Sequence, residues 1–144
     1  MDVKRVSIAL VIGAAVLYAT GYLIWDVLFS DFYAANAGSA TGVNRDRQIV
    51  WAMSLANLGY ACLIIFAMGS RVRGVSIGQG ALIGAVVGFL IWFTVDFNFY
   101  GSTNLSNLTR TLVDPILEFV HGGIAGAVIA TVLRKSGPSG GPAV

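Results

Sequence analysis

Four long runs of apolar residues, separated by shorter polar stretches, dominate the chain. They cover residues 6–29, 49–68, 77–99 and about 112–133. Each has about the 20 residues that a helix needs to cross a hydrocarbon core of roughly 30 Å. A chain in lipid must pair its backbone N–H and C=O groups internally, so helices are expected for such runs. The pattern predicts an all-α membrane protein with four transmembrane helices.

The composition indicates the same class of protein. Of the 144 residues, 56% are hydrophobic and 11% are charged, and the mean hydropathy is +0.78. Average soluble domains carry about 25% charged residues. Too few polar side chains remain to cover a surface in water, so lipid must surround much of the chain. The net charge of +2, without a basic stripe that contains aromatic residues, gives no indication of a nucleic-acid partner.

The length predicts one domain, a four-helix transmembrane unit at residues 1–135, followed by a disordered tail at 136–144. Basic residues predict its orientation. Six of the nine fall on one side of the spans: Lys4, Arg5, Arg71, Arg73, Arg134 and Lys135. The positive-inside rule then places both termini in the cytoplasm, in the cytoplasmic (inner or plasma) membrane, with loops 32–48 and 101–111 outside.

An internal repeat is visible when residues 21–25 (GYLIW) are aligned with residues 88–92 (GFLIW). The same register, without a gap, pairs Gly13 with Gly80 and Gly59 with Gly126. Aromatic residues favour the interface in any membrane helix, so the glycine matches count for more. We therefore expect two tandem hairpins, 1–68 and 69–135. Since both would begin inside, they would be parallel repeats, related by a pseudo-two-fold axis along the membrane normal.

Small residues form a stripe on the third span, where Gly80, Gly84 and Gly88 recur every four residues. Gly122 and Gly126 repeat the spacing on the fourth. Because lipid supplies no hydrophobic drive between helices, such stripes allow the close backbone packing that holds a bundle together. The spacing fits packing within the chain, and it also fits a face for self-association.

Ionisable and polar residues gather toward the outer half of the predicted bundle. The candidate pocket residues are Trp25, Asp26, Trp92, Asp96, Asn98, Glu118 and His121. Asp114, Glu118 and His121 are spaced four and three apart, which places them on one helix face. Ionisable groups at this depth are energetically costly and face the bundle interior or water, so they are candidates for function. Asp114 precedes Pro115, and its expected role is to cap the start of the fourth helix.

Metal and enzyme chemistry receive weaker support. Glu118 and His121 have the Glu-x-x-His spacing by which helical bundles bind metals, but those sites need two such motifs and this chain has one His. A mononuclear metal site at these two residues is therefore the third hypothesis, and it would need further ligands. No nucleophile elbow, phosphate-binding loop or Cys/His zinc pattern occurs. The sequence identifies no cofactor and no catalytic residue.

The chain resembles small four-helix bacterial integral membrane proteins of uncharacterised families. The similar features are Trp25, Phe29 and Tyr33 on the first span, the run 80–84 and Thr94-x-Asp96 on the third, and 112–114 entering the fourth. In those families an Asn often follows the third-span Asp by three residues, whereas here that position is Phe99 and the Asn is Asn98. The resemblance implies a four-helix fold and a bacterial membrane, and it implies no reaction, cofactor or substrate.

Two functions fit these observations. The first is a non-enzymatic membrane protein whose outer-half pocket binds or passes a small polar or cationic solute, or protons. A transporter of this size is expected to be a homo-oligomer, because four helices leave little room to alternate access. The alternative is an accessory subunit that packs against partner membrane subunits and contacts pigment or lipid, with His121 as an axial ligand to a haem or chlorin in one variant.

Overall fold

The computed structural model describes residues 3–69 and 74–134. Arg71, Arg73, Lys135 and the predicted tail at 136–144 lie outside the described residues. The elements, in order, are α1 (Val3–Gly21), a π-helix η1 (Tyr22–Leu28), α2 (Ser30–Ala35), α3 (Val50–Met68), α4 (Ile77–Ser102) and α5 (Leu108–Leu133).

Four helical segments are long and apolar enough to cross a membrane: Val3–Leu28, Val50–Met68, Ile77–Ser102 and Leu108–Leu133. The prediction of an all-helical protein with four membrane-span-like helices is thus confirmed at the expected places. The first segment joins α1 to η1, so it changes from α- to π-helical geometry within its length. The third begins with a capping box, in which the Ser76 side chain accepts from the Gln79 backbone N–H and Gln79 accepts in return.

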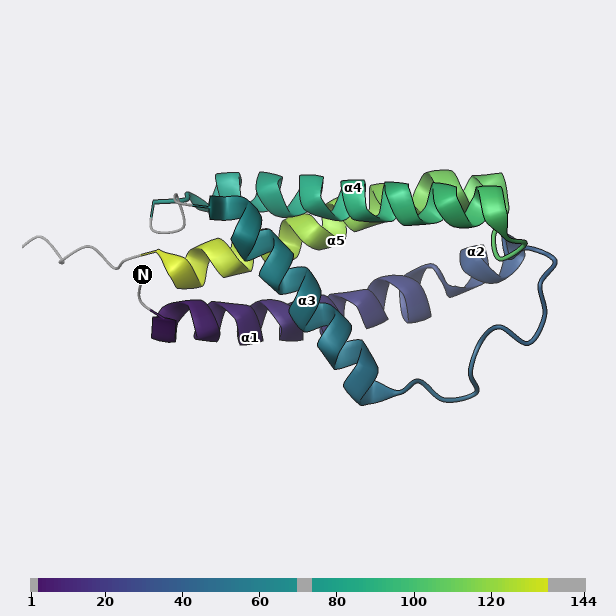
Figure 1. Ribbon diagram of the computed structural model, residues 1–144, viewed down its shortest axis with the longest axis horizontal. Coiled ribbons are helices and arrows are strands. Elements are labelled where there is room, and N and C mark those ends of the chain that lie inside the picture. Colours follow the sequence, from purple (N-terminus) through teal and green to yellow (C-terminus); the bar gives the residue numbers. More distant parts are fainter. Residues whose placement is uncertain (1–2, 70–73, 135–144) are drawn as a thin grey trace, which may run out of the picture.

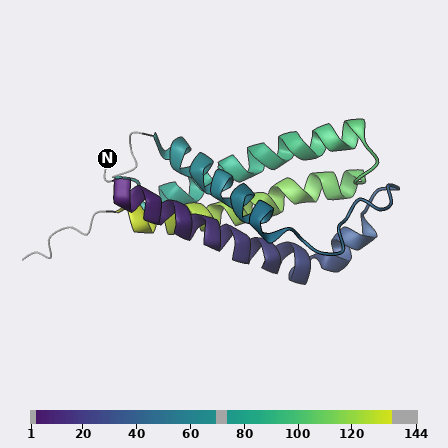
Figure 2. The ribbon, with the colours of Figure 1, turned by 60° about the horizontal axis from the view of Figure 1, so that its bottom comes forward.

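The helices lie roughly along one long axis, except that α3 crosses the others obliquely (Figure 1). Helix α5 packs most extensively against α4 and next against α1, while α3 packs chiefly on α1. The start of α1 and the end of α5 meet at one end of the bundle, where Arg5 donates to the Arg134 carbonyl. We call this the terminal end. The opposite end, which carries α2 and the α4–α5 connection, is the loop end (Figures 1 and 2).

The glycine stripes of α4 and α5 face each other. Gly80, Gly84 and Gly88 are buried on α4, and Gly122 and Gly126 are buried on α5. A Cβ atom added at Gly84 would lie 2.9 Å from the Cα of Gly126 and even closer to the Gly122 carbonyl oxygen. Only glycine therefore allows the two backbones to approach this closely. Because α5 covers the stripe, a partner subunit would have to use another face.

The loop end is more helical than the sequence suggested. Helix α5 begins at Leu108, because the Asn107 side chain caps it by accepting from the Arg110 backbone N–H. Asp114 is then about two turns inside the helix, so the expectation that it caps the helix is wrong. Residues 30–35, expected to lie in or beside the outer loop, form α2, and α4 continues to Ser102.

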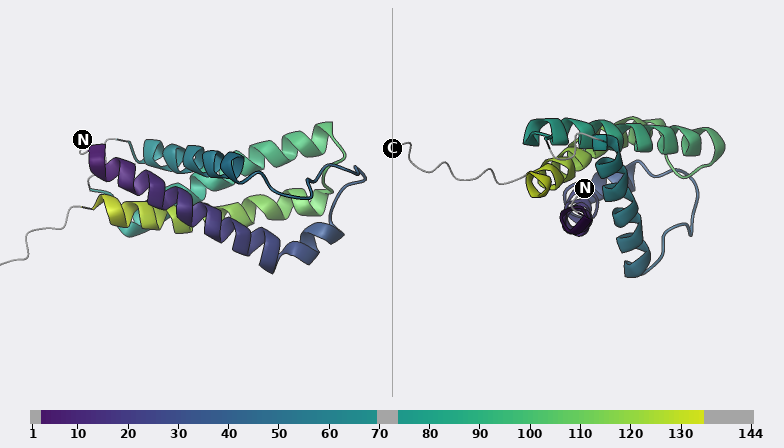
Figure 3. Two further views of the ribbon diagram at one scale, coloured as in Figure 1. Left: turned by 90° about the horizontal axis from the view of Figure 1, so that it is seen from below. Right: turned by 60° about the vertical axis from the view of Figure 1, so that its left-hand side comes forward.

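The two predicted repeat halves differ in structure. In the first, α1 passes into a π-helix and then α2, whereas the aligned part of α4 remains α-helical. Helices α4 and α5 pack along their length, while α1 and α3 diverge toward the loop end (Figure 3). The duplication therefore remains a prediction from the sequence.

Candidate functional site

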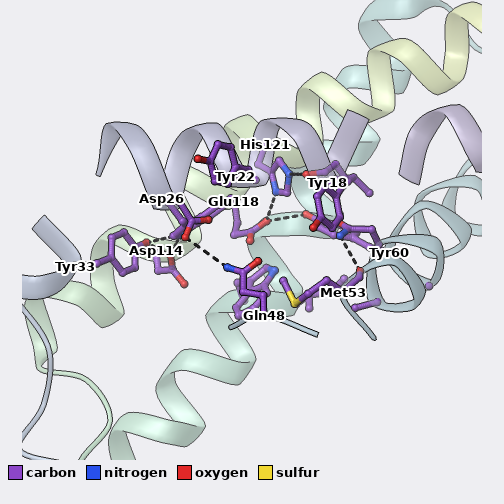
Figure 4. Close-up of a pocket in the computed structure, with 18 of the residues that line it drawn as sticks. Tyr18, Tyr22, Asp26, Tyr33, Gln48, Met53, Tyr60, Asp114, Glu118 and His121 are labelled. Atoms are coloured by element: carbon purple, nitrogen blue, oxygen red, sulfur yellow. Dashed lines mark hydrogen bonds and ion pairs between the residues drawn. The ribbon is translucent and has the colours of Figure 1, made fainter. Parts of the chain in front are cut away.

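A cavity of about 700 Å³ lies in the half of the molecule toward the loop end. It exists because α3 inclines away from α4 and α5 as it approaches this end (Figures 1 and 3). Side chains from α1, η1, α2, α3, α4 and α5 line it, and Figure 4 shows several of them pointing toward one another. The site is therefore assembled from the whole length of the chain.

Helix α5 supplies the buried polar wall of the cavity. Asp114, Glu118 and His121 line it, and their exposed fractions are only 5%, 3% and 4%. Their spacing of four and three residues brings them onto one face of α5, as expected from helical periodicity. Three ionisable groups thus lie together among membrane-span-like helices, where each requires hydrogen-bond partners.

Glu118 is the centre of one hydrogen-bonded group. Its Oε2 atom lies 3.0 Å from Nδ1 of His121 and accepts from the Tyr60 hydroxyl at 3.1 Å. The other ring nitrogen of His121, Nε2, lies 3.0 Å from the backbone carbonyl oxygen of Leu17. The imidazole is also edge-on to the rings of Trp25 and Tyr60, with centroids 5.0 Å and 5.9 Å away. We call Tyr60, Glu118 and His121 the Glu118 cluster.

Asp114 is the centre of a second group. Its Oδ1 atom accepts from Nε1 of Trp25 at 2.8 Å and from the Tyr33 hydroxyl. The Arg110 guanidinium lies over the Tyr33 ring, 4.8 Å from its centroid, in a cation–π arrangement. These contacts join η1, α2 and α5 at the loop end of the cavity. A π-helix is uncommon and often marks a functional site, and here it carries Trp25.

The structure brings five of the seven predicted pocket residues to the cavity: Trp25, Asp26, Trp92, Glu118 and His121. Asp26 is exposed at its edge, where Gln48 donates to it at 3.5 Å. Asp96 and Asn98 are not among the lining residues. Asn98 is exposed on α4, and Oδ2 of Asp96 is buried with no hydrogen-bond partner within residues 3–69 and 74–134.

Several contributors were not predicted from the sequence, among them Asp114, Tyr60 and the Leu17 carbonyl. Asp114 was assigned to a cap, although its spacing from Glu118 already indicated a shared face. Tyr60 lies in the middle of an apolar span, where its hydroxyl needs a hydrogen-bond partner. Its position could therefore have predicted a polar contact inside the bundle. The carbonyl of Leu17 gave no signal, because a backbone acceptor is recognised only once the helices are placed.

The geometry does not favour a metal or haem at His121. Both ring nitrogens already lie within hydrogen-bonding distance of Glu118 and Leu17. Across the described parts of the chain, no three His, Cys, Asp or Glu side chains lie close enough together to hold a metal ion. Further ligands for the proposed mononuclear site are therefore not in place around Glu118 and His121.

The cavity combines aromatic rings with carboxylates. Six aromatic side chains line it: Tyr18, Tyr22, Trp25, Tyr33, Tyr60 and Trp92. Three carboxylates accompany them: Asp26, Asp114 and Glu118. Arg110 is the one permanently charged cation among the described lining residues, and it stacks on Tyr33 at one end.

No family model, curated protein or solved structure matches this chain.

Proposed function

We propose that the protein is a non-enzymatic membrane protein that binds a small organic cation in this cavity. The observation that carries the proposal is the lining itself, with three carboxylates and six aromatic rings against a single arginine. The negative charge of the carboxylates attracts a cation, and Glu118 provides a buried acceptor for it.

The aromatic rings narrow the class of ligand. A cation over the face of Trp or Tyr is attracted by about 0.5–2 kcal/mol, and cages of such rings are a known means of binding quaternary ammonium groups. A small inorganic ion would need several ligands at once, whereas no three His, Cys, Asp or Glu side chains of the described residues lie close enough together to hold one. The lining therefore favours an alkylated ammonium compound, rather than a metal ion, as the ligand.

The size of the cavity agrees with this class. Small-molecule sites usually enclose about 300–1,000 Å³ and are mainly apolar with a few polar groups. A volume of about 700 Å³ leaves room for an organic cation with several carbon atoms. Passage across the membrane, as well as binding, would need movement of α3 or a second copy of the chain.

We further propose the orientation that the basic residues predict, with the terminal end in the cytoplasm of a bacterial cell and the loop end outside. The cavity would then open toward the outer side of the cytoplasmic membrane. The ligand would be drawn from the exterior or from the outer leaflet.

The test is choline binding to the protein in mild detergent, followed by tryptophan fluorescence. Trp25 and Trp92 line the cavity, whereas Trp51 is 71% exposed and does not, so a Trp51→Phe background confines the signal to the site. We expect a saturable change with choline and none with 3,3-dimethylbutan-1-ol, its neutral isostere. Glu118→Gln should weaken binding at least about tenfold, since it removes the buried charge partner.

The matched control is Asp31→Asn, which also neutralises a carboxylate but lies on α2 in an exposed position away from the cavity. It should bind choline like the parent. Equal binding of choline and its neutral isostere, or no saturable binding of either, would overturn the proposal.

A further inference from the structure

The hydrogen bonds of His121 determine how many protons the Glu118 cluster holds. The Leu17 carbonyl can only accept, so the contact at 3.0 Å requires a proton on Nε2. Nδ1 lies 3.0 Å from Oε2 of Glu118. Without a proton between them, these two atoms would direct lone pairs at each other, so the contact requires a second proton. That proton is either on Nδ1, giving an imidazolium and a carboxylate, or on Oε2, giving an imidazole and a carboxylic acid.

Both forms have the same net charge. With the second proton present, Glu118 and His121 together are neutral, and without it they carry one negative charge. The two side chains are only 3% and 4% exposed, within helices apolar enough to span a membrane. An uncompensated charge in such a place is strongly unfavourable. The pair therefore needs one positive charge from outside itself, in the form of a proton or of another cation.

We propose that the organic cation and this proton exclude each other, so that each cation bound at Glu118 releases one proton to water. The inference rests on the proposed function, because it requires the cation to bind beside Glu118. In the empty site the pair holds the proton and is neutral. In the occupied site the carboxylate faces the cation, His121 keeps its Nε2 proton to Leu17, and the total charge is again zero.

The exchange leaves all covalent bonds other than the N–H or O–H bond unchanged. The released proton comes from Nδ1 or Oε2 and passes to water at the cavity edge, where Asp26 is exposed. Tyr60 donates to Oε2, and this hydrogen bond needs no proton from the pair. Once the proton has left, the lone pairs of Nδ1 and Oε2 oppose each other, so the carboxylate is free to turn toward the ligand.

Other ionisable groups surround the pair on every packed element. They are Tyr18 on α1, Tyr22 and Asp26 on η1, Tyr33 on α2, Tyr60 on α3, Asp96 on α4, and Arg110 and Asp114 on α5. Asp114 already accepts from Trp25 and Tyr33, and Asp26 is exposed to solvent. Asp96 lies outside the cavity lining. Asp114 lines the cavity as well, so a variant of Glu118 is needed to assign the released proton to the Glu118–His121 pair.

The test measures proton release when choline is added to the protein in weakly buffered detergent solution, with a pH indicator as the readout. We expect about one proton per choline bound. The apparent Kd should increase about tenfold for each unit by which the pH falls, across the range in which the pair holds its proton. The wild-type protein alone gives both readouts, so the test does not depend on the folding of a variant.

The Glu118→Gln variant tests whether the released proton comes from the Glu118–His121 pair. The amide keeps the shape of the carboxyl group, and an NH2 group in the position of Oε2 can donate one hydrogen to Nδ1 and the other to the Tyr60 oxygen. The variant thus imitates the proton-loaded pair and cannot release a proton. It should bind choline weakly and without pH dependence, while Asp31→Asn should release protons like the wild type.

The outcomes separate the two proposals. Saturable choline binding without proton release would overturn the exchange and leave the proposed function standing. Proton release that persists in Glu118→Gln would overturn the assignment to this pair. Failure of choline to bind at any pH would overturn the proposed function, and the exchange with it.

Discussion

The hydroxyl of Tyr60 on α3 lies 3.1 Å from Oε2 of Glu118 on α5. This contact lies in the wall of the cavity and joins two helices that otherwise touch little. It also explains why a tyrosine lies in the middle of an apolar span, since the ring packs beside His121 while the hydroxyl reaches a buried acceptor. Removing the hydroxyl should therefore affect both the fold and the site.

Tyr60→Phe should lower the free energy of unfolding by about 1 kcal/mol, the usual range for a side-chain hydrogen bond between membrane helices. Unfolding by sodium dodecyl sulfate, followed by circular dichroism, measures the change. Tyr100→Phe is the control, because Tyr100 is 42% exposed near the end of α4. Equal effects of the two substitutions would show that the Tyr60 hydroxyl has no special role.

Gly84→Leu should disrupt the α4–α5 interface. Its side chain would run into the backbone of Gly122 and Gly126, which cannot move aside without separating the helices. We expect a loss of roughly 1–3 kcal/mol or more, as is typical of overpacked sites, measured as a lower Tm in detergent. Gly78→Leu is the matched control, since a Cβ at Gly78 meets open space on the same helix. Unchanged thermal stability and oligomeric state in Gly84→Leu would contradict the packing described here.

Asp114 and Trp25 should be energetically coupled, because Nε1 of Trp25 donates to Oδ1 of Asp114 at 2.8 Å. A double-mutant cycle with Trp25→Phe and Asp114→Ala should give a coupling free energy of about 0.5–1.5 kcal/mol. The measurement is the unfolding free energy of the two single variants and the double variant. A cycle that pairs Trp25→Phe with Asp31→Ala should give a value near zero. Additive effects of Trp25→Phe and Asp114→Ala would exclude a stabilising contact.

Filling the cavity should remove ligand binding without harming the fold. A Cβ at Gly59 meets open space, yet Gly59 lines the cavity on α3. Gly59→Leu should therefore weaken choline binding at least about tenfold while leaving the Tm unchanged or slightly raised. Gly101→Leu also enters open space, near the end of α4 and away from the lining residues, and should bind normally. Normal binding by Gly59→Leu would place the ligand elsewhere.

The sequence predicted the four membrane-span-like helices because length and apolarity alone determine them. Helical periodicity also predicted that Glu118 and His121 share a face with Asp114. The error at Asp114 arose from local reasoning. An acid before Pro115 resembles a helix start, but Asn107 caps the helix about two turns earlier. The mixture of apolar and polar residues between these two positions does not indicate which one begins the helix.

Helix rotation and tilt could not be predicted from one sequence. Asp26 and Asp96 both lie near the loop end of an apolar span, yet only Asp26 lines the cavity, because the rotation of each helix is set by tertiary packing. The π-helical turns at Tyr22–Leu28 likewise carry Trp25, whose hydrogen-bond partner Asp114 is far away in the chain. The tilt of α3, which creates the cavity, is not indicated by any periodic pattern of apolar and polar residues in the sequence.

The orientation can be tested by cysteine labelling in intact bacterial cells that express the protein. Cys62, exposed in the middle of α3, is first replaced by serine to provide a background without thiols. Ser39 lies exposed at the loop end and Val3 at the terminal end. If the positive-inside rule holds, a membrane-impermeant maleimide should label Ser39→Cys in intact cells and Val3→Cys only after permeabilisation. The reverse pattern would place the cavity on the cytoplasmic side, so that the cation would be drawn from the cytoplasm and the released proton would return there.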